Sequence, residues 1–149
     1  MSALEFRDLS PLLNPNGIAV VGASMRPGSA GRLVLENLRG LGFPGAVYAV
    51  HPDRRDVLGF PCYPDLRSLP SRVDLVAVLL GAEKVMPALE EAAQVGARAG
   101  WVLASGFAEA GPEGQARQSQ LVSWAEQAGF LLCGPNCVGV ANLVDRVAA

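Results

Sequence analysis

Short apolar runs alternate with helix-like stretches along almost the whole chain. Each run has the length of one strand, and the stretches between several of them show the three-to-four-residue apolar spacing of an amphipathic helix. Strands that alternate with helices are joined by right-handed crossovers, which build a parallel sheet with helices on both faces. The alternation therefore predicts an α/β fold, a Rossmann-like doubly wound parallel sheet of about five strands.

The positions of these elements can be predicted in outline. The run 73–80 is apolar except for Asp74, which is typical of a central strand buried on both faces. The proline-containing stretch 59–70 is expected to be looser, with at most a short helical turn, and 143–149 gives no structural signal. The expected strands are 18–21, 46–50, 73–80, 101–104 and 130–133, and the expected helices are 31–41, 83–95 and 112–128.

Length and composition limit the class of protein. The 149 residues, half of them hydrophobic and 17% charged, suit one globular domain spanning 1–149 with its core at about 12–143. A net charge of -2 without any basic run argues against nucleic-acid binding. No apolar run approaches the roughly 20 residues that span a bilayer, and the segment 1–8 lacks the apolar stretch of a signal peptide. We therefore expect a cytoplasmic protein without a membrane partner.

Small residues follow four of the five expected strands. The carboxyl ends of parallel strands meet at one edge of the sheet, and ligands of open α/β sheets bind beyond that edge. Glycine there lets a ligand approach backbone amides closely. The strand ends are Gly22-Ala23-Ser24, His51-Pro52, Gly81-Ala82, Ser105-Gly106-Phe107 and Gly134-Pro135-Asn136-Cys137.

The first of these loops, 22–31, connects a strand to a helix. Free amides and the helix dipole at such a helix N-terminus favour a phosphate, to which Ser24, Ser29 and Arg26 could contribute. A plain strand-to-helix turn is the competing interpretation. NAD is disfavoured as the ligand, because Ser24 replaces the second glycine of the NAD fingerprint and no acidic residue ends the second strand. Another adenine nucleotide with phosphates fits better.

Catalytic and metal sites find no support in the sequence. His51 is the only histidine and has no sequence neighbour for a catalytic triad. Together with Cys62, Cys133 and Cys137 it does not give the spacing of a metal site. The three cysteines are expected to be reduced and partly buried, and Cys137 is disfavoured as a nucleophile because nothing near it in sequence would lower its pKa. We expect neither a catalytic residue nor a metal ion in this chain.

A series of short motifs extends from about Leu12 to Leu143. The most specific is the last, with the pattern GPNCxG. The motifs are Asn14-Pro15, Ile18-Ala19-Val20-Val21-Gly22-Ala23-Ser24, Gly42-Phe43-Pro44-Gly45, Val50-His51-Pro52, Leu58-Gly59, Cys62-Tyr63-Pro64, Val73-Asp74-Leu75, Ser105-Gly106-Phe107-Ala108-Glu109 and Gly134-Pro135-Asn136-Cys137-Val138-Gly139. In these motifs the chain resembles the CoA-binding domain of NDP-forming acyl-CoA synthetases, relatives of the succinyl-CoA synthetase alpha subunit. It departs from the family at His51, where asparagine is usual, and at Gly81, where a proline is often present or adjacent.

The resemblance implies that coenzyme A is the ligand and assigns parts of it to residues. Synthetases of this family exchange an acyl-CoA and phosphate for a free acid, CoA and a nucleoside triphosphate. They use a phosphohistidine in a later domain and an ATP-grasp module, so this chain alone should hold CoA without turnover. The implied contacts are phosphates at Gly22, Ala23, Ser24, Arg26, Gly28 and Gly31, adenosine at His51, Pro52, Gly81 and Ala82, pantetheine at Ser105, Gly106 and Phe107, and the reacting thiol at Asn136 and Cys137.

Three other functions stay open at this stage. The chain could be a stand-alone CoA-binding regulatory module. It could be the regulatory domain of a protein acetyltransferase that carries this synthetase-like fold. An NAD-dependent oxidoreductase is the third and least favoured alternative.

Overall fold

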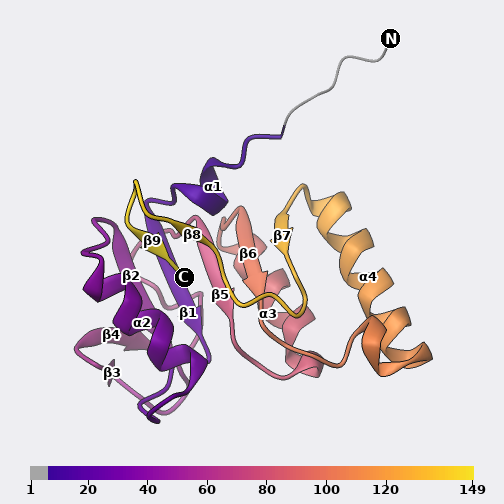
Figure 1. The fold of residues 1–149 in the computed structure, drawn as a ribbon, viewed down its shortest axis with the longest axis horizontal. Coiled ribbons are helices and arrows are strands. Elements are labelled where there is room, and N and C mark those ends of the chain that lie inside the picture. The colour runs from indigo at the N-terminus through magenta and orange to yellow at the C-terminus, as the bar shows by residue number, and fades with distance from the viewer. Residues whose placement is uncertain (1–6) are drawn as a thin grey trace.

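A computed structural model of the chain describes residues 7–149 and contains one mostly parallel seven-stranded sheet (Figure 1). The strands of this sheet follow the order β3-β4-β2-β1-β5-β6-β7, and β8 and β9 form a separate antiparallel pair. The strands are β1 (Gly17–Val21), β2 (Ala46–Val50), β3 (Asp56–Val57), β4 (Phe60–Tyr63), β5 (Leu75–Val78), β6 (Ala99–Val102), β7 (Leu131–Cys133), β8 (Ala141–Asn142) and β9 (Val147–Ala148). The helices are α1 (Ser10–Leu13), α2 (Ala30–Gly40), α3 (Ala82–Gln94) and α4 (Pro112–Ala128), with a 3-10 turn η1 (Ala108–Ala110).

The predicted α/β class is confirmed, with two more strands in the sheet than expected. Every pairing in the sheet is parallel except that of β3 with β4. The strands β1, β5 and β6 are buried at every residue, as central strands with helices on both faces should be. The central pair is in register from Ile18 opposite Leu75 to Val21 opposite Val78.

The apolar core is divided by the sheet into two layers. On one face α2, the strand β9 and Leu12 of α1 pack against Ile18, Val20 and Trp101 of the sheet. On the other face α3 and α4 contribute buried residues such as Leu89 and Leu121. Figure 1 shows α2 and the pair β8–β9 on the near face of the sheet. Helices therefore cover both faces, as the sequence predicted.

Three features differ from the expectations. The proline-containing stretch holds β3 and β4, of which β4 pairs in parallel with β2. The strand β6 begins and ends two residues before the apolar run 101–104, because Ala99 is in register with Leu75 of β5. The last residues, which give no sequence signal, form the β8–β9 hairpin, and Val147 within it is fully buried.

The described part of the chain contains no helix that is both long and apolar enough to cross a membrane. The first six residues, on which part of the localisation prediction rests, lie outside the described range.

Candidate functional site

A groove opens at the point where the strand order reverses. The chain passes from β1 to β2 on one side and later returns to β5 on the other side of β1. Open α/β sheets bind ligands outside the carboxyl ends of the strands at such a switch point. The groove there has a volume of about 520 Å³. Its lining is Val21, Gly22, Val50, His51, Pro52, Pro64, Asp65, Leu66, Leu80, Lys84, Pro87, Ala88 and Glu91.

The groove unites three of the predicted site residues, Gly22, His51 and Pro52. The His51 ring is oriented by the loop, because its Nδ1 accepts a hydrogen bond of 3.2 Å from the amide of Asp53. Lys84 and Glu91 add charges from α3 that sequence reasoning did not assign to the site. The sequence signal that could have found them is their spacing: seven residues apart on the predicted helix, Lys84 and Glu91 lie on the same helix face.

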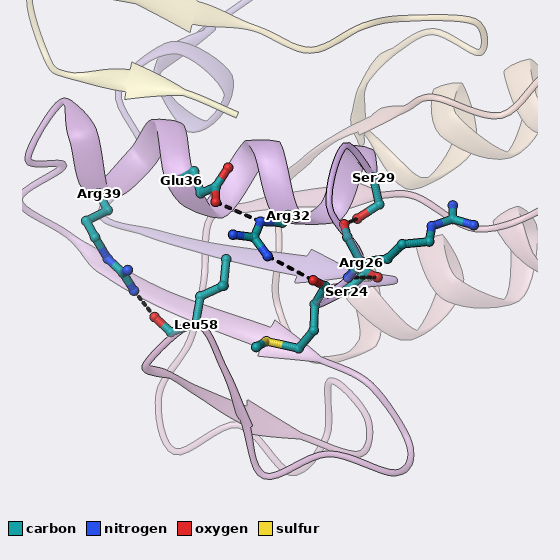
Figure 2. A network of polar contacts seen from close by, with 8 residues as sticks. Ser24, Arg26, Ser29, Arg32, Glu36, Arg39 and Leu58 are labelled. Carbon is teal, nitrogen blue, oxygen red and sulfur yellow. Dashed lines mark hydrogen bonds and ion pairs between the residues drawn. The ribbon is translucent and has the colours of Figure 1, made fainter.

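The loop before α2 is held by its own polar side chains (Figure 2). The amide of Arg26 donates to Oγ of Ser24 at 3.1 Å, and the hydroxyl of Ser29 donates to the carbonyl of Arg26 at 2.8 Å. The guanidinium of Arg32 bonds both the carbonyl of Met25 at 2.9 Å and the carboxylate of Glu36 at 2.7 Å. The two serines therefore brace the loop, whereas sequence reasoning proposed them as phosphate donors.

Two backbone amides at the start of α2 lack a backbone hydrogen-bond partner among the described residues. The amides of Arg32 and Leu33 donate to the carbonyl of Ser29. The amides of Ala30 and Gly31 have no backbone partner within residues 7–149. Unpaired amides and the helix dipole together favour a negatively charged ligand at this position.

The glycines of this loop serve different purposes. A Cβ on Gly22, which has a φ of +89°, would lie 2.5 Å from the carbonyl oxygen of Leu79. A Cβ on Gly31 would lie 2.5 Å from the carbonyl oxygen of Gly22. Nothing lies within 4 Å of the corresponding position at Gly28. Gly22 and Gly31 are thus required by the close packing of β1, β5 and α2, and Gly28 alone faces open space.

A second group of predicted residues gathers around the carboxylate of Glu109. The amides of Gly106 and Phe107 donate to its Oε1 at 2.6 Å and 3.1 Å. A hydrogen bond from the side chain of Asn136 and these backbone amides lower the pKa of Glu109 to about 2. Glu109 therefore joins the loops after β6 and β7, a role that sequence reasoning missed although Glu109 ends one of the quoted motifs.

The remaining predicted residues surround this cluster. Gly81 precedes α3, and a Cβ on Gly106 would lie 3.3 Å from the Cβ of Ala82, so these loops approach closely. Ser105 is exposed. Phe107 is only 1% exposed and belongs to the core, and its amide and carbonyl are bonded to Glu109 and Ala110, so the structure gives it a packing role. The groove at the switch point and this cluster share no lining residue.

The loop after β7 is fixed to β6. The amide of Asn136 donates to the carbonyl of Ala104 at 3.1 Å, and that of Cys137 donates to the carbonyl of Val102 at 3.0 Å. The sulfur of Cys137 lies 3.4 Å from that of Cys133. Burial, together with the neighbouring Cys137, raises the pKa of the Cys133 thiol. Within residues 7–149, no group of three or more His, Cys, Asp or Glu side chains is arranged to hold a metal ion.

Comparison with known proteins identifies the family. The profile of the family described as "CoA binding domain" matches residues 16–142. The chain belongs to this CoA-binding domain family. It is 43% identical over 131 residues to the Archaeoglobus fulgidus protein named acetate–CoA ligase [ADP-forming] I, with 88% of this chain and 19% of that protein covered. It is 35% identical over 145 residues to the Pyrococcus furiosus acetate–CoA ligase [ADP-forming] I subunit alpha, with 95% and 31% covered.

A solved structure agrees with this membership. The dinucleotide-forming acetyl-coenzyme A synthetase 1 of Ca. Korarchaeum cryptofilum, solved with phosphate and ADP, superposes with a TM-score of 0.88 at 34% identity. The alignment covers 94% of this chain and 30% of that one. The CoA-binding domain predicted from the sequence motifs is thus confirmed, and the acetyltransferase and oxidoreductase alternatives are not favoured. The chain spans well under two thirds of each of these relatives.

Proposed function

We propose that this CoA-binding domain binds CoA or acyl-CoA along the carboxyl edge of its sheet and presents the thiol to other domains of an NDP-forming acyl-CoA synthetase. The observation that carries the proposal is the switch-point edge itself, where Gly31, whose amide has no backbone partner among the described residues, packs against Gly22 of the groove lining. An anion bound at this amide would have next to it a groove of about 520 Å³, which is large enough for an adenosine. No residue of this chain is required to perform chemistry.

Each part of CoA has a matching part of the edge in this proposal. The start of α2 takes the pyrophosphate, with Ala23, Gly28 and the exposed Arg26 around it. The groove takes the adenosine between His51 and Leu80. The pantetheine then runs past Gly106 towards Asn136 and Cys137. The Glu109 cluster supports this last part by holding the two loops together.

Further synthetase domains are the proposed partners, in the same chain or in a second one. Both curated relatives are much longer than the matched segment. Three apolar side chains are largely exposed to solvent: Val138 at 91%, Leu143 at 71% and Val144 at 89%. Neighbouring exposed apolar side chains of this kind are typical of a surface that contacts another protein or domain. These three lie on or near the β8–β9 hairpin, which also borders an apolar groove of about 470 Å³ against α2. We propose that another domain covers this surface, and that residues 1–149 form one unit of the larger enzyme.

The proposed location is the cytoplasm. The cysteines Cys62, Cys133 and Cys137 are all free, which suits a reducing compartment. We propose that the 149-residue chain binds CoA but has no synthetase activity by itself, because the phosphohistidine and the nucleotide-binding module of the family lie in other domains.

A substitution at Ser29 tests the phosphate position without endangering the fold. Aspartate is as good a helix N-cap as serine, so Ser29→Asp should keep α2 intact. It loses the hydroxyl that donates to the Arg26 carbonyl; Ser29→Asn also loses this hydroxyl and has nearly the same shape as aspartate without the charge, so it separates the two effects and should bind CoA more tightly than Ser29→Asp. The aspartate adds a negative charge beside the amides of Ala30 and Gly31, and repulsion should weaken CoA binding by about tenfold or more, or ~1.4 kcal/mol. Calorimetric titration with CoA measures the effect. Ser123→Asp, on the exposed surface of α4, is the matched control and should bind CoA as the wild type does.

A thermal-shift series with CoA, acetyl-CoA, NAD, NADP and ATP tests the ligand class. A ligand that binds only the folded state raises the melting temperature with the logarithm of its concentration. CoA and acetyl-CoA should give the largest shifts. A larger shift with NAD, or unchanged CoA affinity in a folded Ser29→Asp variant, would contradict the proposal.

A further inference from the structure

Two thiols are held side by side at the end of β7. The sulfur atoms of Cys133 and Cys137 lie 3.4 Å apart, and each residue is half-buried. Three residues separate them, whereas two residues separate the cysteines of the redox motif Cys-x-x-Cys. The third cysteine, Cys62, is buried in β4, near the edge of the sheet opposite to β7.

The neighbouring strand fixes both cysteines. Cys133 pairs in register with Trp101 of β6. Cys137 donates its amide to the carbonyl of Val102, the next residue of the same strand. Because both backbones are anchored to adjacent positions of β6, the closeness of the thiols is a property of the sheet and not of two free side chains. Only a small movement of the sulfur atoms separates this arrangement from a disulfide.

We propose that Cys133 and Cys137 form a redox-modification site, a dithiol that small aliphatic disulfides convert to an intramolecular disulfide. The thiolate of Cys137 attacks one sulfur of the external disulfide, whose S–S bond breaks, and the departing thiolate takes up a proton. The deprotonated sulfur of Cys133 then attacks Cys137 in this mixed disulfide and releases the second external thiol. One external disulfide is reduced to two thiols, and two protein thiols are oxidised to one disulfide.

The local contacts support this order of attack. The sulfur of Cys137 accepts a hydrogen bond from the amide of Gly139 at 3.4 Å, and Cys137 lies between the exposed residues Asn136 and Val138, where an external disulfide can reach it. The raised pKa of Cys133 keeps it protonated more often, which suits the thiol that reacts second. Oxidation would also remove the hydrogen bond that the Cys137 thiol donates to the carbonyl of Gly139, and so would change the loop at the end of the proposed CoA site.

Intact-mass analysis of the reduced chain after incubation with glutathione disulfide tests the site. The wild type should lose two hydrogens, and peptide mapping should link Cys133 to Cys137. Cys133→Ser should instead stop at one glutathione bound to Cys137, and Cys137→Ser should lose the linkage. Cys62→Ser is the matched control and should form the linkage as the wild type does. Circular dichroism of each variant establishes that it is folded.

The inference is overturned if the wild type, folded and reduced, stays unmodified, accumulates only mixed disulfides, or forms its linkage through Cys62. In a second experiment CoA disulfide replaces glutathione disulfide, to test whether the CoA site delivers the oxidant to the two cysteines. Only this second experiment rests on the proposed function. Faster oxidation by CoA disulfide in the wild type but not in Ser29→Asp would show that the CoA site delivers the reagent. Equal rates with both reagents would show a general disulfide site, and loss of CoA binding alone would leave the glutathione result intact.

Discussion

At the scale of single residues, glycines that look alike in the sequence have different surroundings in the structure. Sequence reasoning assigned Gly22, Gly28 and Gly31 alike to phosphate binding. The structure shows that Gly22 and Gly31 each face a backbone carbonyl at the distance of a clash, and only Gly28 leaves room. The difference depends on which strand lies opposite, and that information is absent from the local sequence. Gly22→Val would be a poor test of CoA binding, because its side chain would collide with the backbone of Leu79 and would damage the fold first.

Gly31→Ala should destabilise the chain by about 1–3 kcal/mol, because its Cβ would meet the carbonyl oxygen of Gly22 at 2.5 Å and force backbone to move. Gly40→Ala, at the other end of α2, is the matched control. No atom lies within 4 Å of its Cβ position, so the better helix propensity of alanine should leave stability unchanged or raise it by up to about 1 kcal/mol. Urea unfolding of the three proteins measures both. Equal stability of Gly31→Ala and wild type would refute the packing role.

Glu109 gives the chain a pH dependence of known sign. Its pKa in the folded chain is about 2, below the ordinary 4.5, so the unfolded chain binds its proton first as the pH falls. The stabilisation is therefore complete above about pH 4.5 and is lost between there and about pH 2. Glu109→Gln should be less stable than wild type at neutral pH, and this difference should shrink below about pH 4.5.

Denaturant unfolding from pH 7 down to the acid transition measures this difference. Glu90→Gln is the control, since Glu90 is exposed on α3. Its stability should follow that of the wild type at every pH. A Glu109→Gln difference that is independent of pH would mean that shape rather than charge holds the two loops together.

At the scale of elements, periodic patterns were readable and short irregular ones were not. The bounds of α2, α3 and α4 fall within a residue of the expected helices, because α2 and α3 each have an apolar face and α4 begins at Pro112 and stops at Gly129. The strand β4 was missed because Pro61 lies within it, and it is tolerated there beside the two-residue strand β3 at the edge of the sheet. The β8–β9 hairpin was missed because two-residue strands show no alternation; its mutual hydrogen bonds and the packing of β9 against α2 define it.

The hairpin should nevertheless contribute to stability. Val147 is fully buried against α2, and Val147→Ala should cost about 1–3 kcal/mol through lost contacts and a residual cavity. Val144, which is 89% exposed in the same hairpin, provides the control, and Val144→Ala should change stability by less than about 0.5 kcal/mol. Urea unfolding compares the two. If both variants unfold like the wild type, the hairpin is not part of the cooperative unit.

At the scale of the whole molecule, alternation of strands and helices was sufficient to predict one sheet with its ligand edge. The parallel arrangement gathers every predicted loop at that edge, and this much follows from chain direction alone. The division of this edge into two separate regions does not follow from chain direction. The groove beside His51 and the cluster around Glu109 are distinct regions, and they depend on side chains from α3 and η1 whose orientation only tertiary packing sets.

If one CoA molecule extends over both regions, hydrogen exchange should report it at two distant points of the sequence. Added CoA should slow amide exchange in peptides covering 22–31 and 134–139, because the phosphates meet the start of α2 and the pantetheine meets the loop after β7. ADP lacks the pantetheine arm and should slow exchange only in the first peptide. Peptides from 116–128 of α4 serve as the internal control and should be unaffected by either ligand. Protection by CoA confined to 22–31 would mean that the arm leaves the edge before Asn136, and the two regions would then serve different ligands.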